Sequence, residues 1–403
     1  MGPHPVGLVH DFLLTRRGAE RTFEAITDLW PEAPVYTTVY SVRGTEGRYA
    51  GRQVHPSYLQ RLRLGQSSFR ALLPLYPGAV ERLRIEDHPL LISSSSAFAH
   101  GVRPAAGTVH VCYCHTPFRY AWSERARASQ EVRAPLRRPL ERCLDRIRRW
   151  DLAASGRVTR YIANSKLTRE RIRDLYGRDA AVVHPPVDVE RFRPSAPEDF
   201  LLVVSGLVAH KRIDVALEAV RLAGGRARVV GEGPERARLQ ARFGDVADFH
   251  GWVGDRELAG LYSRCRALVV PAAEEFGIAV VEAQAAGRPV VALASGGALE
   301  TVVDGETGVL VAGDTPGEFA EVIRESDFER FDAMAAIRSA ARFSVARFRS
   351  RLLREVERAA GVSAHKRSDR SQGPSNGLPP RRHTCPTPSR IPSAPPHSRL
   401  SSR

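Results

Sequence analysis

The sequence predicts an α/β protein built from two doubly wound domains that face a central cleft. The chain has 403 residues, which exceeds the size at which a single hydrophobic core usually stops growing, so two domains are expected. Short apolar runs alternate with segments of helical period, and this alternation favours parallel sheets with crossover helices. The apolar runs of the second half lack polar alternation, as expected of strands that helices cover on both faces.

The first domain is predicted over residues 1–186. RGAERTFEAITDLW has the period of a helix and follows the first apolar run. Pro185 and Pro186 interrupt both helix and sheet, so we expect the connector to the second domain there. The expected strands are PVGLVHDFL, APVYTTVY, and residues 90–96, 108–115 and 160–165.

The second domain is predicted over residues 187–345 and repeats the pattern more regularly. A further helix is expected at 346–360, able to pack back on the first domain. Residues 361–403 are rich in Ser, Pro and Arg with few large apolar side chains, so we expect a disordered basic tail. The expected strands are DFLLVVSG, RARVVGEG, ADFHGWV, RALVVPA and RPVVALA, and the expected helices are RIDVALEAVRLA, PERARLQARFG, DRELAGLYSRC and IAVVEAQAAG.

Positive charge is concentrated in two places. The net charge is +15, and Val362 to Arg403 holds eight Lys or Arg against one Asp, which leaves +8 for the rest of the chain. Residues 119–149 carry ten arginines and four acids, interleaved with leucines and prolines. This segment is either an amphipathic surface for anionic lipid headgroups or a solvated helical face. No nucleic-acid-binding motif accompanies the charge, so nucleic acid is not an expected partner.

The sequence predicts a cytoplasmic protein, either free or peripheral on the inner face of the cell membrane. No apolar run approaches the roughly 18 residues that span a bilayer, and the N-terminus lacks the pattern of a secretory signal. The five cysteines are odd in number and scattered, which fits reduced thiols. Cys112 and Cys114 have no second Cys or His pair at finger spacing, so no metal site is expected.

The segment AAEEFG joins a predicted strand to a predicted helix. Glu274 falls at the carboxyl end of the strand, where open α/β sheets bind ligands, and the amides of Phe276, Gly277 and Ile278 begin the helix. A helix N-terminus with glycine suits a pyrophosphate. Glu282 follows one turn after Ile278 and could accept hydrogen bonds from ribose hydroxyls. The alternative is a capping acid and a solvated helix residue.

Three further positions follow predicted strands. Lys211 is one of three lysines among 60 basic residues, and with Arg212 it could neutralise a diphosphate. Gly18 opens the first predicted helix and could admit phosphate oxygens. His115 follows a strand and could contact a sugar hydroxyl. Each also has a structural interpretation: a solvated charge, a turn glycine and a packed histidine.

Taken together, these motifs resemble glycosyltransferase family 4, retaining enzymes of GT-B fold, over roughly residues 5–360. Glu274 and Glu282 match the family's E-x7-E motif. The resemblance implies that Glu274 contacts the donor sugar, Glu282 the ribose, Lys211 the diphosphate and His115 the transferred sugar, with no metal and no cofactor. Four segments are similar to those of bacterial mannosyltransferases of O-antigen and polysaccharide assembly: HTPFRYAW, ANSKLTRERI, HPPVDVERF and GGALETVVDGETGVLV.

Two positions depart from the family pattern. Gly206 stands where many relatives have Arg, which would leave one phosphate contact to Arg212. Arg17 precedes Gly18 where relatives often have Gly-Gly, and it could add a phosphate contact.

The resemblance implies transfer of a hexose, mannose from GDP-mannose, to a lipid-linked or growing polysaccharide. The expected partners are a nucleotide-sugar donor and a glycan or glycolipid acceptor. A nucleotide-sugar isomerase of the 2-epimerase type and a catalytically silent nucleotide-sugar-binding scaffold remain as alternatives. A dinucleotide oxidoreductase is disfavoured because no G-x-G-x-x-G follows a predicted strand.

Overall fold

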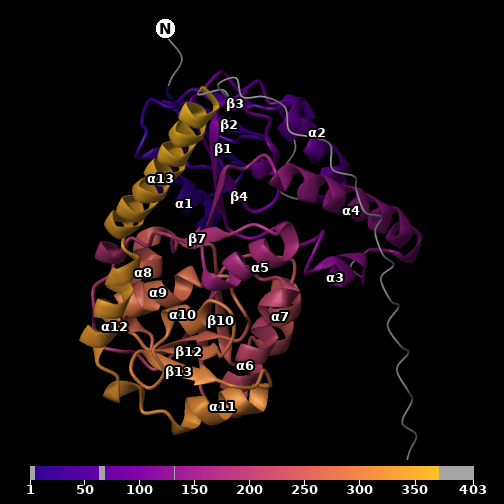
Figure 1. The fold of residues 1–403 in the computed structure, drawn as a ribbon. Helices are drawn as coiled ribbons and strands as arrows, with labels where there is room; N and C mark the ends of the chain where they lie inside the picture. The colour runs from indigo at the N-terminus through magenta and orange to yellow at the C-terminus, as the bar shows by residue number, and fades with distance from the viewer. Residues whose placement is uncertain (1–4, 63–68, 131, 372–403) are drawn as a thin grey trace, which may run out of the picture. The chain divides into compact units, whose positions relative to one another are not determined.

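The chain forms two fully parallel, doubly wound sheets, in agreement with the predicted fold class (Figure 1). The structure is a computed structural model that describes residues 5–62, 69–130 and 132–371. All strand pairs in both sheets are parallel, and helices form most of the crossovers. The two sheets lie on either side of the predicted domain boundary at residues 186 and 187.

The first sheet has the strand order β3-β2-β1-β4-β5-β6-β7. Its strands are β1 (Val6–His10), β2 (Val35–Thr37), β3 (Val54–Pro56), β4 (Leu90–Ser95), β5 (Val109–Cys114), β6 (Arg160–Ala163) and β7 (Ala180–Val182). The helices of this half are α1 (Gly18–Thr27), α2 (Tyr76–Glu81), α3 (Arg125–Gln130), α4 (Ala134–Ser155) and α5 (Lys166–Tyr176), with short 3-10 turns at Tyr58–Leu62, Phe69–Leu75 and Ala99–Gly101.

The second sheet has the order β10-β9-β8-β11-β12-β13, the 3-2-1-4-5-6 arrangement of Rossmann domains. Its strands are β8 (Leu201–Val204), β9 (Ala227–Val230), β10 (Ala247–Gly251), β11 (Ala267–Val270), β12 (Val290–Leu293) and β13 (Gly308–Val311). The helices are α6 (Ile213–Leu222), α7 (Arg236–Phe243), α8 (Asp255–Arg264), α9 (Ile278–Ala285), α10 (Ala298–Thr301), α11 (Pro316–Glu325) and α12 (Ala333–Ala340).

The last described helix, α13 (Val345–Ser371), returns the chain from the second sheet to the first (Figure 1). The chain passes from the first sheet to the second near Val187 and returns after Phe343. These two segments lie side by side, since Val187 N donates to Phe343 O (2.9 Å). Phe348 and Leu352 of α13 are buried in one apolar cluster with Val6 and Leu8 of β1.

The predicted end of the last helix at residue 360 is wrong, because α13 continues through Ser371. The sequence placed the tail's start at 361 on its polar composition, which does not prevent a helix already under way from continuing. The remainder of the predicted tail, 372–403, lies outside the described residues.

The structure bears on the expected state of the cysteines and on membrane-spanning helices. Cys112 and Cys114 are buried on β5 as free thiols. Within the described ranges, no helix is both long and apolar enough to cross a membrane.

Candidate active site

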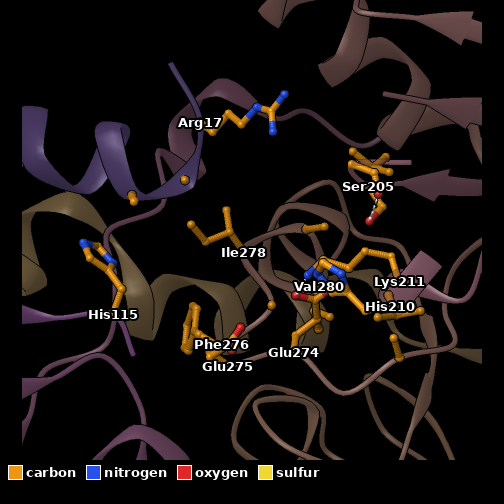
Figure 2. Close-up of a pocket in the computed structure, with 18 of the residues that line it drawn as sticks. Arg17, His115, Ser205, His210, Lys211, Glu274, Glu275, Phe276, Ile278 and Val280 are labelled. Atoms are coloured by element: carbon orange, nitrogen blue, oxygen red, sulfur yellow. Dashed lines mark hydrogen bonds and ion pairs between the residues drawn. The ribbon is translucent and has the colours of Figure 1, made fainter. Parts of the chain in front are cut away.

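The carboxyl ends of both sheets open into one cleft of about 530 Å³ (Figure 2). Each sheet reverses its strand order at one point, between β1 and β4 in the first and between β8 and β11 in the second. Such switch points create the crevices in which α/β proteins bind ligands. Gly18, Ser96 and His115 line the cleft from the first half, and Gly206, Lys211 and Glu274 line it from the second.

The loop from β11 to α9 forms one wall of the cleft. Glu274, Phe276, Gly277 and Ile278 all line it, as the sequence predicted for a ligand-binding loop. Gly277 has φ +86°, a left-handed conformation that glycine adopts without strain, and it is the N-cap of α9, whose first residues also line the cleft. Gly297 N donates to Glu274 O (2.8 Å), which anchors the loop to the start of α10. The wall therefore presents a fixed helix N-terminus.

Lys211 and Glu274 form an ion pair inside the cleft, although they lie 63 positions apart in the sequence. Lys211 ends the 3-10 turn Ala209–Lys211, which follows β8. Its neighbour His210 also lines the cleft, and burial together with the charge of Lys211 lowers the pKa of His210 to about 4. The lysine predicted to contact the diphosphate and the glutamate predicted to contact the donor sugar thus lie side by side in the structure (Figure 2).

Arg212 does not line the cleft, although His210 and Lys211 before it do. Its guanidinium pairs with Asp314, and Arg212 is not among the residues that line the cleft. The backbone turns away at this residue, which has φ +49° and precedes α6. The side chain of Arg212 therefore does not line the cleft in this structure, whereas Arg17 and Arg119 do.

His115 lies on the opposite wall, directly after β5 (Figure 2). It is only 8% exposed, and its Nε2 lies 2.9 Å from Ser94 Oγ. Burial lowers its pKa to about 4, although the carboxylate of Glu275 opposes the shift. The imidazole is therefore neutral at physiological pH. Gly18 faces Ile278 across the cleft so closely that a Cβ at residue 18 would come within 2.9 Å of the Ile278 side chain.

Glu275 is a cleft residue that the sequence interpretation missed. Arg171 Nη1 donates to Glu275 Oε1 (3.1 Å), and Arg119 Nη1 lies 3.7 Å from the same oxygen. Burial would raise the pKa of Glu275, but the positive charges of Arg119, Lys211 and Arg171 outweigh it and hold that pKa below its usual range. Glu275 therefore links the donor-side loop to two arginines of the first half, and only its place in AAEEFG could have signalled it.

Glu282 lies in an adjoining pocket of about 240 Å³ rather than in the main cleft. Arg191 Nη2 donates to its Oε1 (2.8 Å), and Tyr262 OH donates to its Oε2 (2.9 Å). Burial raises the pKa of Glu282, although both partners oppose the shift. The adjoining pocket shares Arg17, Gly18 and Gly206 with the main cleft, so the two are continuous.

The crevice at the first switch point is filled by the side chain of Asp11, which follows β1. Its carboxylate accepts hydrogen bonds from four consecutive amides after β4: Ser96 N (2.5 Å), Ala97 N (3.0 Å), Phe98 N (2.7 Å) and Ala99 N (2.6 Å). Asp11 is 2% exposed. The amides that could hold an external anion on this sheet already hold an internal one.

No group of three or more His, Cys, Asp or Glu side chains among the described residues is arranged to hold a metal ion. The fold and the site define a two-domain α/β protein with a ligand cleft between two Rossmann-like sheets.

Comparison with known families agrees with this class. The model for Glycosyltransferase Family 4 matches residues 16–191, and the model for Glycosyl transferases group 1 matches residues 198–326. These matches cover most of the first sheet and all of the second. The chain belongs to glycosyltransferase family 4 and has the GT-B fold.

Individual relatives are also glycosyltransferases by name. D-inositol 3-phosphate glycosyltransferase of Frankia alni is 35% identical over 200 residues, covering 41% of this chain and 49% of the relative. The Mycobacterium tuberculosis protein with the same name is 32% identical over 235 residues, covering 50% and 49%. The match thus spans about half the length of these relatives.

Solved structures share the fold at low sequence identity. Anabaena HepE in complex with UDP-glucose aligns with a TM-score of 0.65 and 19% identity, over 88% of this chain and 100% of HepE. Sucrose-phosphate synthase from Thermosynechococcus elongatus aligns with a TM-score of 0.64 and 17% identity, over 88% and 100%.

Proposed function

We propose that this chain is a retaining glycosyltransferase that transfers mannose from GDP-mannose to a hydroxyl of a lipid-linked or growing polysaccharide. The observation that carries the proposal is the Lys211–Glu274 ion pair beside the N-terminus of α9, with His115 on the opposite wall. A cation and helix amides suit a diphosphate, and a carboxylate and an imidazole suit sugar hydroxyls. The names of the curated relatives support glycosyl transfer, and the UDP-glucose complex of HepE supports a nucleotide-sugar donor.

Under this proposal the donor's diphosphate binds against the first amides of α9 and draws the ammonium of Lys211 away from Glu274. Glu274 then becomes available to the hydroxyls of the donor sugar. As the bond to the sugar breaks, negative charge accumulates on the departing diphosphate, and Lys211 and the amides near Gly277 stabilise it. These groups supply the positive charge from the chain itself, so the proposal requires no metal and no cofactor.

The neutral state of His115 is also consistent with glycosyl transfer. Sugars develop positive charge at the anomeric carbon as the leaving group departs. A protonated imidazole would repel that charge, whereas the low pKa of His115, about 4, keeps it neutral. We propose that His115 hydrogen-bonds a hydroxyl of the transferred sugar.

The test is a screen of GDP-mannose, other GDP-sugars and UDP-sugars for release of nucleoside diphosphate, with and without glycan acceptors. A glycosyltransferase releases nucleotide at a rate that rises with acceptor. A 2-epimerase would turn over the donor at full rate without acceptor, and a silent scaffold would bind it without turnover. Either result would refute the proposed reaction.

We also propose that residues 119–149 dock reversibly on the anionic inner face of the cell membrane. The first turns of α4 are exposed at Ala134–Pro139, where Leu136 is 56% exposed next to Arg137 and Arg138. This combination of an apolar side chain and cationic side chains suits anionic headgroups.

Liposome co-sedimentation tests this docking. The double substitution Arg137→Glu/Arg138→Glu is expected to abolish binding to anionic vesicles, whereas Arg324→Glu/Arg330→Glu, at exposed positions of the second half, is not. Binding that is indifferent to lipid charge and to salt would refute the docking.

A further inference from the structure

A buried carboxylate of the first half, that of Asp151 on α4, takes no part in the transfer chemistry proposed above. We infer that Asp151 is a positioning residue for that transfer: through Trp122 it fixes the turn Phe118–Glu124, which carries Arg119 into the cleft. The inference rests on the proposed function, because glycosyl transfer is the activity that the turn serves.

Asp151 interrupts an apolar face of α4. The helix buries Leu144, Ile147, Asp151 and Ala154, which recur at the three- to four-residue spacing of one helical face. Asp151 itself is 0% exposed. A buried carboxylate is costly unless hydrogen-bond donors compensate its charge, so its partners indicate which segments it holds.

The partners of Asp151 come from three other segments of the first half. Trp122 Nε1 and Tyr176 OH each donate to its Oδ2 (2.7 Å). Its Oδ1 lies 3.3 Å from His100 Nε2. Among these three partners, Trp122 is the one that lies in the loop after β5, which lines the cleft as far as Arg119. The hydrogen bond from the indole therefore joins α4 to a wall of the cleft.

A compact turn links Trp122 to Arg119. The carbonyl oxygen of Arg119 accepts from both Trp122 N (3.1 Å) and Glu124 N (2.8 Å), and Ala121 N donates to Phe118 O (3.0 Å). These bonds make the turn one unit. Fixing the indole therefore also fixes the backbone from which the Arg119 side chain extends.

The side chain of Arg119 joins the first half to the donor-side loop of the second. Its Nη1 lies 3.4 Å from Glu124 Oε1 within the turn and 3.7 Å from Glu275 Oε1 in that loop. Glu275 directly follows Glu274, the carboxylate that pairs with Lys211. A displacement of about 1 Å can cost about 10² in rate, so the position of Arg119 bears on transfer although Asp151 itself does not line the cleft.

Variants of the full chain test the inference through acceptor-dependent release of nucleoside diphosphate and through the Kd for that diphosphate. Trp122→Phe removes the indole N–H and is expected to lower kcat about tenfold. Asp151→Asn removes the charge at nearly constant volume and is expected to have the same effect. Both should bind the diphosphate within about twofold of wild type, because the crevice of the second half is unchanged.

Trp150→Phe is the matched control. Trp150 Nε1 likewise donates to a carboxylate of the first half, Glu81 Oε1 (2.8 Å), but Trp150 lies on α4, outside the turn. Both tryptophans are half-buried. We therefore expect a similar fall in the thermal midpoint from both Phe variants, but a lower kcat from Trp122→Phe alone.

A double-mutant cycle separates positioning from simple stabilisation. Arg119→Ala is expected to lower kcat about tenfold, and if Asp151 acts through Arg119, adding Asp151→Asn should lower kcat no further. An additional loss of about tenfold in Arg119→Ala/Asp151→Asn, or equal kcat in Trp122→Phe and Trp150→Phe, would overturn the inference while leaving a glycosyltransferase intact. Absence of nucleotide release from wild type with every donor would instead refute the proposed function.

Discussion

The two sheets present crevices of the same topology to one cleft, but the chain treats them differently. Between β1 and β4, the carboxylate of Asp11 accepts from four amides and fills the crevice. Between β8 and β11, the corresponding space is lined by Gly206, and a Cβ there would meet no atom within 4 Å. Topology therefore makes both crevices available, and side-chain chemistry determines which one can receive an anion.

This difference assigns the two halves different roles. The second half offers Lys211 and the N-terminus of α9 to a ligand, so we propose it as the donor side. In the first half, the four amides after β4 already donate to Asp11, and this half contributes the neutral His115 to the cleft.

The largest effect is expected on the open side. Lys211→Ala and Glu274→Ala should each lower kcat by about 10² to 10³, since each removes a preorganised group from the charge-bearing site. Lys166→Ala is the matched control, because Lys166 lies outside the residues that line the cleft. Full activity in either cleft variant, with the thermal midpoint unchanged, would refute the assigned site.

In the crevice between β1 and β4, substitution of Asp11 should reduce the stability of the fold rather than donor binding. Asp11→Ala leaves four buried amides without an acceptor, so we expect the free energy of unfolding to fall by about 3–5 kcal/mol. Urea denaturation measures this, with the exposed Asp87→Ala as control. Loss of GDP binding at unchanged stability would instead identify this crevice as a ligand site.

The buried histidines of the first half should make the fold sensitive to acid. Burial lowers the pKa of His10 and His110 to about 3 and that of His115 to about 4. Because the unfolded chain binds these protons near pH 6.5 and the folded chain does not, stability is full above pH 6.5 and falls as the pH drops toward 4. Each histidine should cost about 1.4 kcal/mol per pH unit in that window.

Urea midpoints between pH 7.5 and 4.5 test this pH dependence. His110→Asn should flatten the curve, since Asn carries no titrating group. A midpoint that stays constant or rises on acidification would contradict the assigned protonation states.

The smallest effect is expected for Arg212. Because its guanidinium pairs with Asp314, Arg212→Ala should change kcat/KM by less than about threefold, as exposed ion pairs contribute little. A loss near 100-fold would mean that the side chain leaves Asp314 for the diphosphate when the donor binds.

The regular parts of this molecule were predictable from the sequence. The long apolar runs and the strand-to-helix loops predicted two parallel sheets, and they placed Lys211, Glu274 and His115 at the carboxyl edges of those sheets. The strands β3, β7 and β13 escaped prediction: each lies at the edge of its sheet and has only three or four residues, and β3 ends on Pro56. Segments this short at the edge of a sheet carry no periodicity to read.

Pairs that are distant in the chain were also unpredictable. The Arg212–Asp314 pair joins residues 102 positions apart, and Glu275 acquires its partners from Arg119 and Arg171 in the other half. No local pattern encodes such contacts, since they depend on how the two sheets face each other. The role of Asp11 was missed for the same reason.

The central claim is that the donor's diphosphate binds in the open crevice of the second sheet. A crystal structure of the full chain with GDP tests it most directly. We predict diphosphate oxygens at the amides of Gly277 and Ile278, with Lys211 moved from Glu274 onto the phosphate. Diphosphate bound between β1 and β4, with Asp11 displaced, would contradict the account.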